Sequence, residues 1–282
     1  MDSYNQNQNQ YQTGGYADYQ GPPEGNVALS PNMYAVNNQP QYQDPQNYPN
    51  DKYDQADNDD SIEFMVRKGF IVKTYGILIS QLIISTIFIA LTFFDSIREK
   101  LVIDTSARPL ITAFLAIFLI VTIVVFVMFT CFRDTARKVP INYILLFSYT
   151  LCMSFYLMLL CAETKPKYVI SALILTCGET VALTVYAWTT KRDFTYCGGF
   201  LFAFVLILIL SAGLFFWCGL YAFYCGLGVL LYSLYLIYDT QLILGKFRYE
   251  YNIDDYCFAA LNLYIDIVYL FIKILQILGN SK

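Results

Sequence analysis

Long stretches without a charged residue dominate the chain beyond residue 73. Residues 74–94, 109–132 and 139–162 contain no Asp, Glu, Lys or Arg, and residues 168–190 contain only Glu179. A helix needs about 20 apolar residues to cross the hydrocarbon core of a bilayer. Stretches of this length therefore predict transmembrane helices, and they exclude an ordinary soluble domain for this part of the chain.

The rest of the sequence brings the predicted number of spans to seven. Residues 194–238 form an uncharged run of 45 residues, too long for one helix and long enough for two, with Gly219 as the natural turn between them. The predicted spans are 72–94, 109–132, 141–162, 168–190, 197–217, 220–244 and 256–279. Because these segments do not alternate apolar and polar residues, we predict an all-α seven-helix membrane bundle over residues 61–282 rather than a β-barrel.

Residues 1–60 differ in composition from the rest of the chain. They contain ten Asn, ten Gln, eight Tyr and six of the nine Pro, but no Ile or Phe. Their charge is one-sided, with nine acidic residues and one basic residue. Such a segment cannot bury enough apolar surface to offset the entropy lost on ordering. We therefore expect a disordered amino-terminal tail, which is either only solvated or also binds a partner.

The basic residues predict the orientation of the bundle. With the tail in the cytosol, eleven Lys and Arg residues fall on the cytosolic side and seven on the opposite side. Loops that carry more Lys and Arg tend to stay in the cytosol. We therefore expect a cytosolic amino terminus and a carboxyl terminus on the far side. If the last span is instead re-entrant, the carboxyl terminus is cytosolic as well.

The composition also excludes several kinds of chemistry. The chain has no histidine, which removes Ser–His and Cys–His nucleophiles and His-ligated zinc. No strongly basic surface for nucleic acid is present, since only 14% of the residues are charged and the net charge is −4. We expect no enzymatic activity, no cofactor and no nucleic-acid partner, and the partners that the composition predicts are membrane lipids.

Three carboxylates are expected at membrane depth: Glu179, Asp239 and Asp266. A charged side chain inside a bilayer is costly, so each is a candidate functional residue. The midpoint in sequence between Asp239 and Asp266 falls between Asn252 and Ile253, inside the charged link 245–255. In an antiparallel hairpin, residues equidistant from the turn lie at similar depth. The spacing therefore predicts that these two carboxyl groups can face each other inside the membrane.

Two carboxyl groups that share a dry site cannot both stay ionised, and such a pair is expected to exchange protons near physiological pH. The protonated pair can hold the last two helices together, whereas the ionised pair repels unless a cation lies between its members. Oxygen ligands suit Ca²⁺, but two side chains supply only part of its shell, so binding is expected to be weak and transient. The alternative is that each aspartate bonds a neighbouring hydroxyl, such as that of Thr240 or Tyr264.

Two further charged residues each have two interpretations. Glu179 is expected near mid-depth, where it either extends an acidic ion path or is a protonated acid bonded to a threonine of its own helix. Lys273 lies seven residues after Asp266 and therefore on the same helical face. It either extends to the membrane interface or guards the outer mouth of an ion path.

Several motifs in the second half of the chain carry a resemblance to a known family. Residues 238–243 read Tyr-Asp-Thr-Gln-Leu-Ile, and residues 259–268 read Ala-Ala-Leu-Asn-Leu-Tyr-Ile-Asp-Ile-Val. Together they closely resemble the signature of the Bax-inhibitor family, the transmembrane Bax inhibitor motif proteins. Residues 183–195 look like the exit of that family's fourth span, and residues 137–143 look like the start of its third. The Tyr/Pro/Gln-rich leader is similar to that of the Lifeguard branch.

The resemblance implies seven helices with the last one central. It also implies a pH-sensitive Ca²⁺ leak through an intracellular membrane, of the endoplasmic reticulum or Golgi, that restrains cell death by lowering store calcium. The family's paired aspartates correspond to Asp239 and Asp266. Bacterial members have an arginine in the second span that latches an aspartate, and residues 109–132 contain none. Glu179 stands where the family's pattern predicts an apolar residue.

Other functions stay open at this point. One is a non-conducting membrane adaptor whose residues 1–60 bind apoptotic regulators or receptors. Another is a coupled H⁺/Ca²⁺ exchanger that uses the same two carboxylates. An intramembrane aspartyl protease is disfavoured, because Leu-Ile-Tyr and Leu-Tyr-Ile precede the two aspartates where such enzymes have glycine.

Overall fold

The fold is a bundle of long helices, seen here in a computed structural model that describes residues 51–102, 108–217, 219–247 and 250–280. Within these ranges the chain is helical and has no β-strand. The elements are α1 (Asp51–Leu91), α2 (Asp95–Val102), α3 (Arg108–Cys131), α4 (Arg133–Ala136), α5 (Ile141–Glu163), α6 (Pro166–Thr189), the 3₁₀ helix η2 (Thr195–Cys197), α7 (Gly198–Trp217), α8 (Tyr221–Leu244), the 3₁₀ helix η3 (Ile253–Asp255) and α9 (Tyr256–Asn280).

Seven segments in the described ranges are long and apolar enough to cross a membrane, which confirms the predicted all-α seven-helix membrane bundle. They are Ile62–Leu91, Pro109–Phe129, Ile141–Glu163, Pro166–Thr189, Thr195–Gly213, Tyr221–Leu244 and Ile253–Asn280. The predicted boundaries agree with these segments except at the first span, which begins well before the predicted residue 72. Gly219 has a φ of 69° and forms the predicted turn before α8, in a left-handed conformation that glycine adopts without strain.

The predicted tail extends too far along the chain. α1 begins at Asp51, so residues 51–60 are helical rather than disordered. This segment contains Lys, Gln and Ala, which are good helix formers. Residues 1–50, the rest of the predicted tail, lie outside the described residues.

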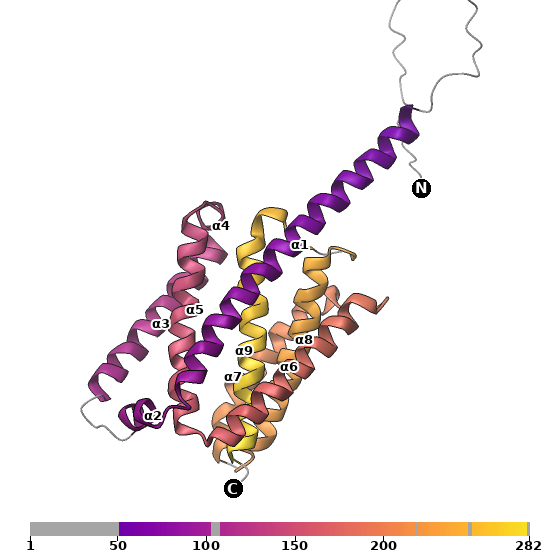
Figure 1. The fold of residues 1–282 in the computed structure, drawn as a ribbon. Helices are drawn as coiled ribbons and strands as arrows, with labels where there is room; N and C mark the ends of the chain where they lie inside the picture. The colour runs from indigo at the N-terminus through magenta and orange to yellow at the C-terminus, as the bar shows by residue number, and fades with distance from the viewer. Residues whose placement is uncertain (1–50, 103–107, 218, 248–249, 281–282) are drawn as a thin grey trace, which may run out of the picture. The chain divides into compact units, whose positions relative to one another are not determined.

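α9 lies at the centre of the bundle, as the family resemblance implied (Figure 1). It contacts α1, α5, α6 and α8, and its contact with α8 is the most extensive between any two described helices. α9 runs as one continuous helix of 25 residues, which argues against a re-entrant last span. We call the end of the bundle where α8 leads into α9 the amino end, and the end where α9 stops the carboxyl end.

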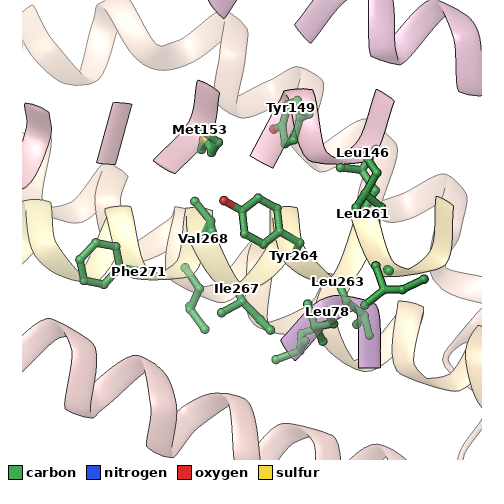
Figure 2. Packing of buried hydrophobic residues seen from close by; sticks show 14 of the residues in the cluster. Leu78, Leu146, Tyr149, Met153, Leu261, Leu263, Tyr264, Ile267, Val268 and Phe271 are labelled. Atoms are coloured by element: carbon green, nitrogen blue, oxygen red, sulfur yellow. The ribbon is translucent and has the colours of Figure 1, made fainter. Parts of the chain in front are cut away.

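The packing around α9 combines close apolar contacts with buried polar ones. Figure 2 shows Tyr264 and Val268 of α9 facing Tyr149 and Met153 of α5. The Tyr264 hydroxyl lies 2.7 Å from the Ser85 hydroxyl of α1. A bundle in a membrane gains little from apolar burial alone, so such packing and interhelical hydrogen bonds hold the helices together.

Candidate functional site

The carboxyl groups of Asp239 on α8 and Asp266 on α9 meet inside the bundle. Their side chains are 5% and 4% exposed, and both line the same cavity. The structure thus brings the two aspartates together, as their spacing in the sequence predicted.

A tyrosine from the link between α8 and α9 completes the surroundings of this pair. The Tyr251 hydroxyl donates to Oδ1 of Asp239 at 2.8 Å and accepts from Nδ2 of Asn262 at 2.7 Å. Loss of solvent around this hydroxyl, together with the nearby Asp239 carboxylate, raises the pKa of Tyr251 well above its usual range. Tyr251 thus stays protonated and acts as a hydrogen-bond donor. Oδ2 of Asp266 has no hydrogen-bond partner among the described residues.

The alternative of a hydroxyl partner holds for Asp239, which accepts from the Tyr251 hydroxyl, but the two hydroxyl groups named from the sequence are not the partners. The Tyr264 hydroxyl bonds Ser85 and not an aspartate. The Thr240 hydroxyl makes no hydrogen bond to a described residue. Thr240 is one residue after Asp239 and Tyr264 is two residues before Asp266, so both point to other faces of their helices, because the side chains of a helix turn by about 100° from one residue to the next.

Arg67 of α1 holds the link that carries Tyr251. Its guanidinium donates to the carbonyl oxygens of Tyr251 at 2.7 Å and Leu242 at 2.8 Å, and it forms an ion pair with Glu250 at 3.2 Å. The Tyr251 amide also donates to the Leu242 carbonyl at 3.1 Å. The link therefore folds back over the end of α8, and Arg67 stabilises it there with hydrogen bonds from a planar, multivalent donor.

A glycine allows Arg67 to approach so closely. Gly245 ends α8 in a left-handed conformation with a φ of 63°, which favours glycine at the end of a helix. A Cβ at this position would overlap the guanidinium of Arg67 and the carboxylate of Glu250. Any larger residue at position 245 would therefore displace the arginine.

The aspartate pair lines a cavity of about 1150 Å³ near the amino end of the bundle. Its lining also includes Tyr232, Tyr251 and Asn262, and it reaches Arg137 and Asp255. Arg137 donates to Oδ1 and Oδ2 of Asp255 at 2.7 and 2.9 Å, a bidentate ion pair. The cavity is thus large enough for a hydrated ion, with the buried carboxyl pair in its wall.

Glu179 does not belong to this cavity. It lies on α6 and lines a separate, mostly apolar groove that also includes Val229 and Ile274. Its Oε1 accepts a hydrogen bond from the Ser233 hydroxyl of α8 at 2.6 Å. The predicted bond to a threonine of its own helix is wrong, since the partner lies on a neighbouring helix. Nothing in the described geometry connects Glu179 to the aspartate pair.

The oxygen atoms around the pair form an incomplete shell for a metal ion. In the described ranges, no group of three or more Cys, Asp or Glu side chains is placed to hold a metal. The pair offers two carboxyl groups, with the Tyr251 hydroxyl next to them. This donor set suits weak and incomplete coordination of a hard cation such as Ca²⁺.

Sequence reasoning missed Tyr251, Asn262 and Arg67. Asn262 carried a usable signal, because it precedes Asp266 by four residues and therefore shares its helical face. Tyr251 and Arg67 carried none, because their contacts depend on the path of the link and on the packing of α1, 175 residues or more before its partners.

Comparison with known proteins gives a family for this arrangement. The family model described as "Inhibitor of apoptosis-promoting Bax1" matches residues 67–282. Protein lifeguard 3 from Homo sapiens is 31% identical over 289 residues, which cover 95% of this chain and 89% of that protein. A BI1-like protein from Arabidopsis thaliana is 35% identical, with 78% of this chain and 83% of that protein covered. Protein LIFEGUARD 4 from the same plant is 33% identical, with 77% and 87% covered. The chain is a multi-pass membrane protein that belongs to the Bax-inhibitor family, in its Lifeguard branch.

Proposed function

We propose that this chain is a pH-sensitive Ca²⁺ leak pathway of an intracellular membrane and that it restrains cell death by lowering the calcium content of that store. The description of the family model supports a role in the control of apoptosis. The ion path itself is supported by one observation: two buried carboxyl groups from facing membrane helices meet in a cavity that can hold a hydrated cation. We place the amino terminus in the cytosol and the protein in the endoplasmic reticulum or Golgi.

The direction of the pH response follows from the chemistry of the pair. At acidic pH both carboxyl groups can carry protons, and their hydrogen bond joins α8 to α9. As the pH rises, the pair loses its proton and two negative charges face each other in a dry site. The charges repel until a cation lies between them. Ca²⁺ flux is therefore expected to be low at acidic pH and to increase as the pH rises.

The test is Ca²⁺ flux from liposomes that contain the purified protein, measured in steps from about pH 6 to about pH 8. Asp239→Asn and Asp266→Asn replace a titrating group by a neutral one of the same shape. Each is expected to flatten the pH dependence. The matched control is Asp254→Asn, which changes an exposed aspartate of η3. A wild-type pH response in both pair variants would refute the role of the aspartates.

A non-conducting adaptor is the second candidate function. The match to human Protein lifeguard 3 covers 95% of this chain and so extends into the amino-terminal segment before the membrane bundle. A binding role for that segment predicts that deletion of residues 1–50 abolishes the effect on cell death and leaves Ca²⁺ flux in liposomes intact. Loss of both, or of neither, would contradict the adaptor.

A further inference from the structure

The aspartate cavity ends at a pair of stacked tyrosines on the side of the carboxyl end. Tyr232 of α8 is part of the cavity wall, and its ring stacks on that of Tyr269 of α9, with centroids 5.2 Å apart and an interplanar angle of 12°. Tyr269 lies three residues beyond Asp266, almost one helical turn. The stacked rings therefore lie between α8 and α9 beside the aspartate pair, where Tyr232 forms part of the cavity wall and Tyr269 does not.

The next residue along the same face of α9 is Lys273. Its side chain packs against Gly228 of α8, where a Cβ would lie within 2.9 to 3.0 Å of the lysine's methylene carbons. Its ammonium lies 4.7 Å from the centre of the Tyr224 ring and donates to Oε1 of Gln276 at 3.4 Å. Lys273 thus lies half-buried between α8 and α9, and of its two predicted interpretations the position at a mouth fits better than extension along a lipid-facing surface.

The charge of Lys273 has no ionic partner in the part of the chain that the structure describes. The described ion pairs there involve Arg67 and Arg137 instead. At the carboxyl end, a second cavity of about 330 Å³ lies between the end of α5, the start of α6 and the end of α9, with Tyr221 as its lining residue from α8. Gln276, which accepts from Lys273, is part of its wall. The seam between α8 and α9 therefore contains, in order, the aspartate cavity, the tyrosine stack and the lysine, and the second cavity adjoins the lysine through Gln276.

We propose that this seam is the whole ion path, with the Tyr232–Tyr269 stack as its constriction and Lys273 as a charge barrier that keeps divalent cation flux low. The proposal rests on the proposed Ca²⁺ leak and adds where the ion leaves the aspartate pair and what limits it. Seven residues separate Asp266 and Lys273, about 10 Å along the helix. An ion that leaves the pair in this direction passes an unpaired positive charge at close range.

The barrier has a signature that distinguishes it from a simple plug. The repulsion between Lys273 and an ion is proportional to the ion's charge. Removal of the lysine charge therefore lowers the energy barrier twice as much for a divalent cation as for a monovalent one. The factor by which the divalent flux increases is then the square of the factor for the monovalent flux. We expect Lys273→Met to raise Ca²⁺ flux about tenfold and K⁺ flux about threefold at a pH at which the pair is ionised.

Methionine preserves the length and packing of the lysine stem, and Lys273→Gln is a second neutral variant in case the first does not fold. The matched control is Lys167→Met, which removes an exposed lysine of α6 at the same end of the bundle but outside the seam. Tyr269→Leu tests the constriction separately. Because it widens the path without changing charge, it should raise Ca²⁺ and K⁺ flux by similar factors.

The outcomes separate this proposal from the one on which it rests. A larger increase for Ca²⁺ than for K⁺ in the neutral Lys273 variants, absent in Lys167→Met, supports the barrier. Equal increases, or none, in a protein whose flux still depends on Asp239 and Asp266 would overturn the barrier and leave the leak intact. If the wild-type protein carries no Ca²⁺ beyond protein-free liposomes, the proposed function fails, and the proposed path fails with it.

Discussion

α9 and α3 differ in their surroundings: α9 is enclosed by other helices, whereas little of α3 is buried in the protein. The Pro109–Phe129 span of α3 has a mean hydropathy of 3.2, and 6% of it is buried in the protein, whereas the Ile253–Asn280 span has a mean hydropathy of 1.8 and is 72% buried. In a bilayer the most apolar helix gains nothing from leaving the lipid. Helices with polar residues are the ones that need protein neighbours. The two spans that carry the aspartate pair, in α8 and α9, accordingly combine mean hydropathies of 1.5 and 1.8 with 56% and 72% burial.

The comparison predicts that truncation has its largest effect on the central helix. Leu270 of α9 is fully buried, and Leu210 of α7 is 81% exposed on the lipid-facing surface. Leu270→Ala leaves a cavity among close-packed helices and should destabilise the folded protein by about 2–3 kcal/mol. Leu210→Ala replaces a contact with lipid and should cost less than about 0.5 kcal/mol. Unfolding of both variants in detergent by a denaturant series gives the two losses of stability. Equal losses would contradict the contrast between the central helix and a lipid-facing one.

The same contrast explains how much the sequence could predict. The spans were predictable because charged residues are costly inside a bilayer, so they mark its borders. The meeting of Asp239 and Asp266 was predictable because antiparallel neighbours with a short link have a fixed register. The start of α1 was not, since Arg67 looks like a border charge although two of its guanidinium nitrogens donate to carbonyl oxygens inside the bundle.

The contacts of the link could not be predicted for a different reason. Tyr251 is one of 25 tyrosines, and no local pattern shows that its hydroxyl reaches Asp239. Such a contact depends on the path of a short irregular segment and on a third helix, α1, that packs against it. The partner of Glu179 was missed in the same way, because Ser233 approaches from α8 and the sequence order gives no sign of it.

A second prediction concerns the amino end of the central pair, where Arg67 holds the link. Arg67→Met removes two hydrogen bonds from a charged donor to the link and should release Tyr251 from the aspartate pair. We expect Ca²⁺ flux at acidic pH to rise about tenfold, because the loss of these bonds destabilises the closed arrangement of the link by about 1.4 kcal/mol. Backbone amide hydrogen exchange of the link should accelerate in the same variant.

The matched control for Arg67→Met is Glu250→Gln. It removes the ion pair with Arg67 but keeps the two hydrogen bonds to the link carbonyls. The Glu250 side chain is 51% exposed, and exposed ion pairs contribute little to stability. Its flux should therefore stay within about twofold of wild type. If Glu250→Gln opens the path as much as Arg67→Met does, the hydrogen bonds are not what holds the link.

A smaller effect is expected from the hydroxyl of Tyr251. Tyr251→Phe keeps the ring in place, including its edge-on contact with Phe258, and removes only the bonds to Asp239 and Asn262. Loss of these hydrogen bonds should destabilise the closed arrangement of the link by about 1 kcal/mol and raise Ca²⁺ flux at acidic pH about fivefold. Because the pKa of Tyr251 lies well above its usual range, its hydroxyl does not titrate near neutral pH. The flux of Tyr251→Phe should accordingly keep a pH response, and loss of that response would assign the sensor to the tyrosine.

Glu179 provides the last and smallest effect, because α6 departs from the relation between hydropathy and burial. Its Pro166–Thr189 span has a mean hydropathy of only 1.7 but is 17% buried, so a polar residue here does not indicate the centre. Glu179→Gln can keep the hydrogen bond from Ser233, since an amide oxygen accepts as a carboxyl oxygen does. We expect the pH dependence of Ca²⁺ flux in this variant to match that of wild type in the same liposomes. A shifted or flattened response would mean that the groove between α6 and α8 communicates with the aspartate pair, and that carboxylates at membrane depth act together here even when they line separate cavities.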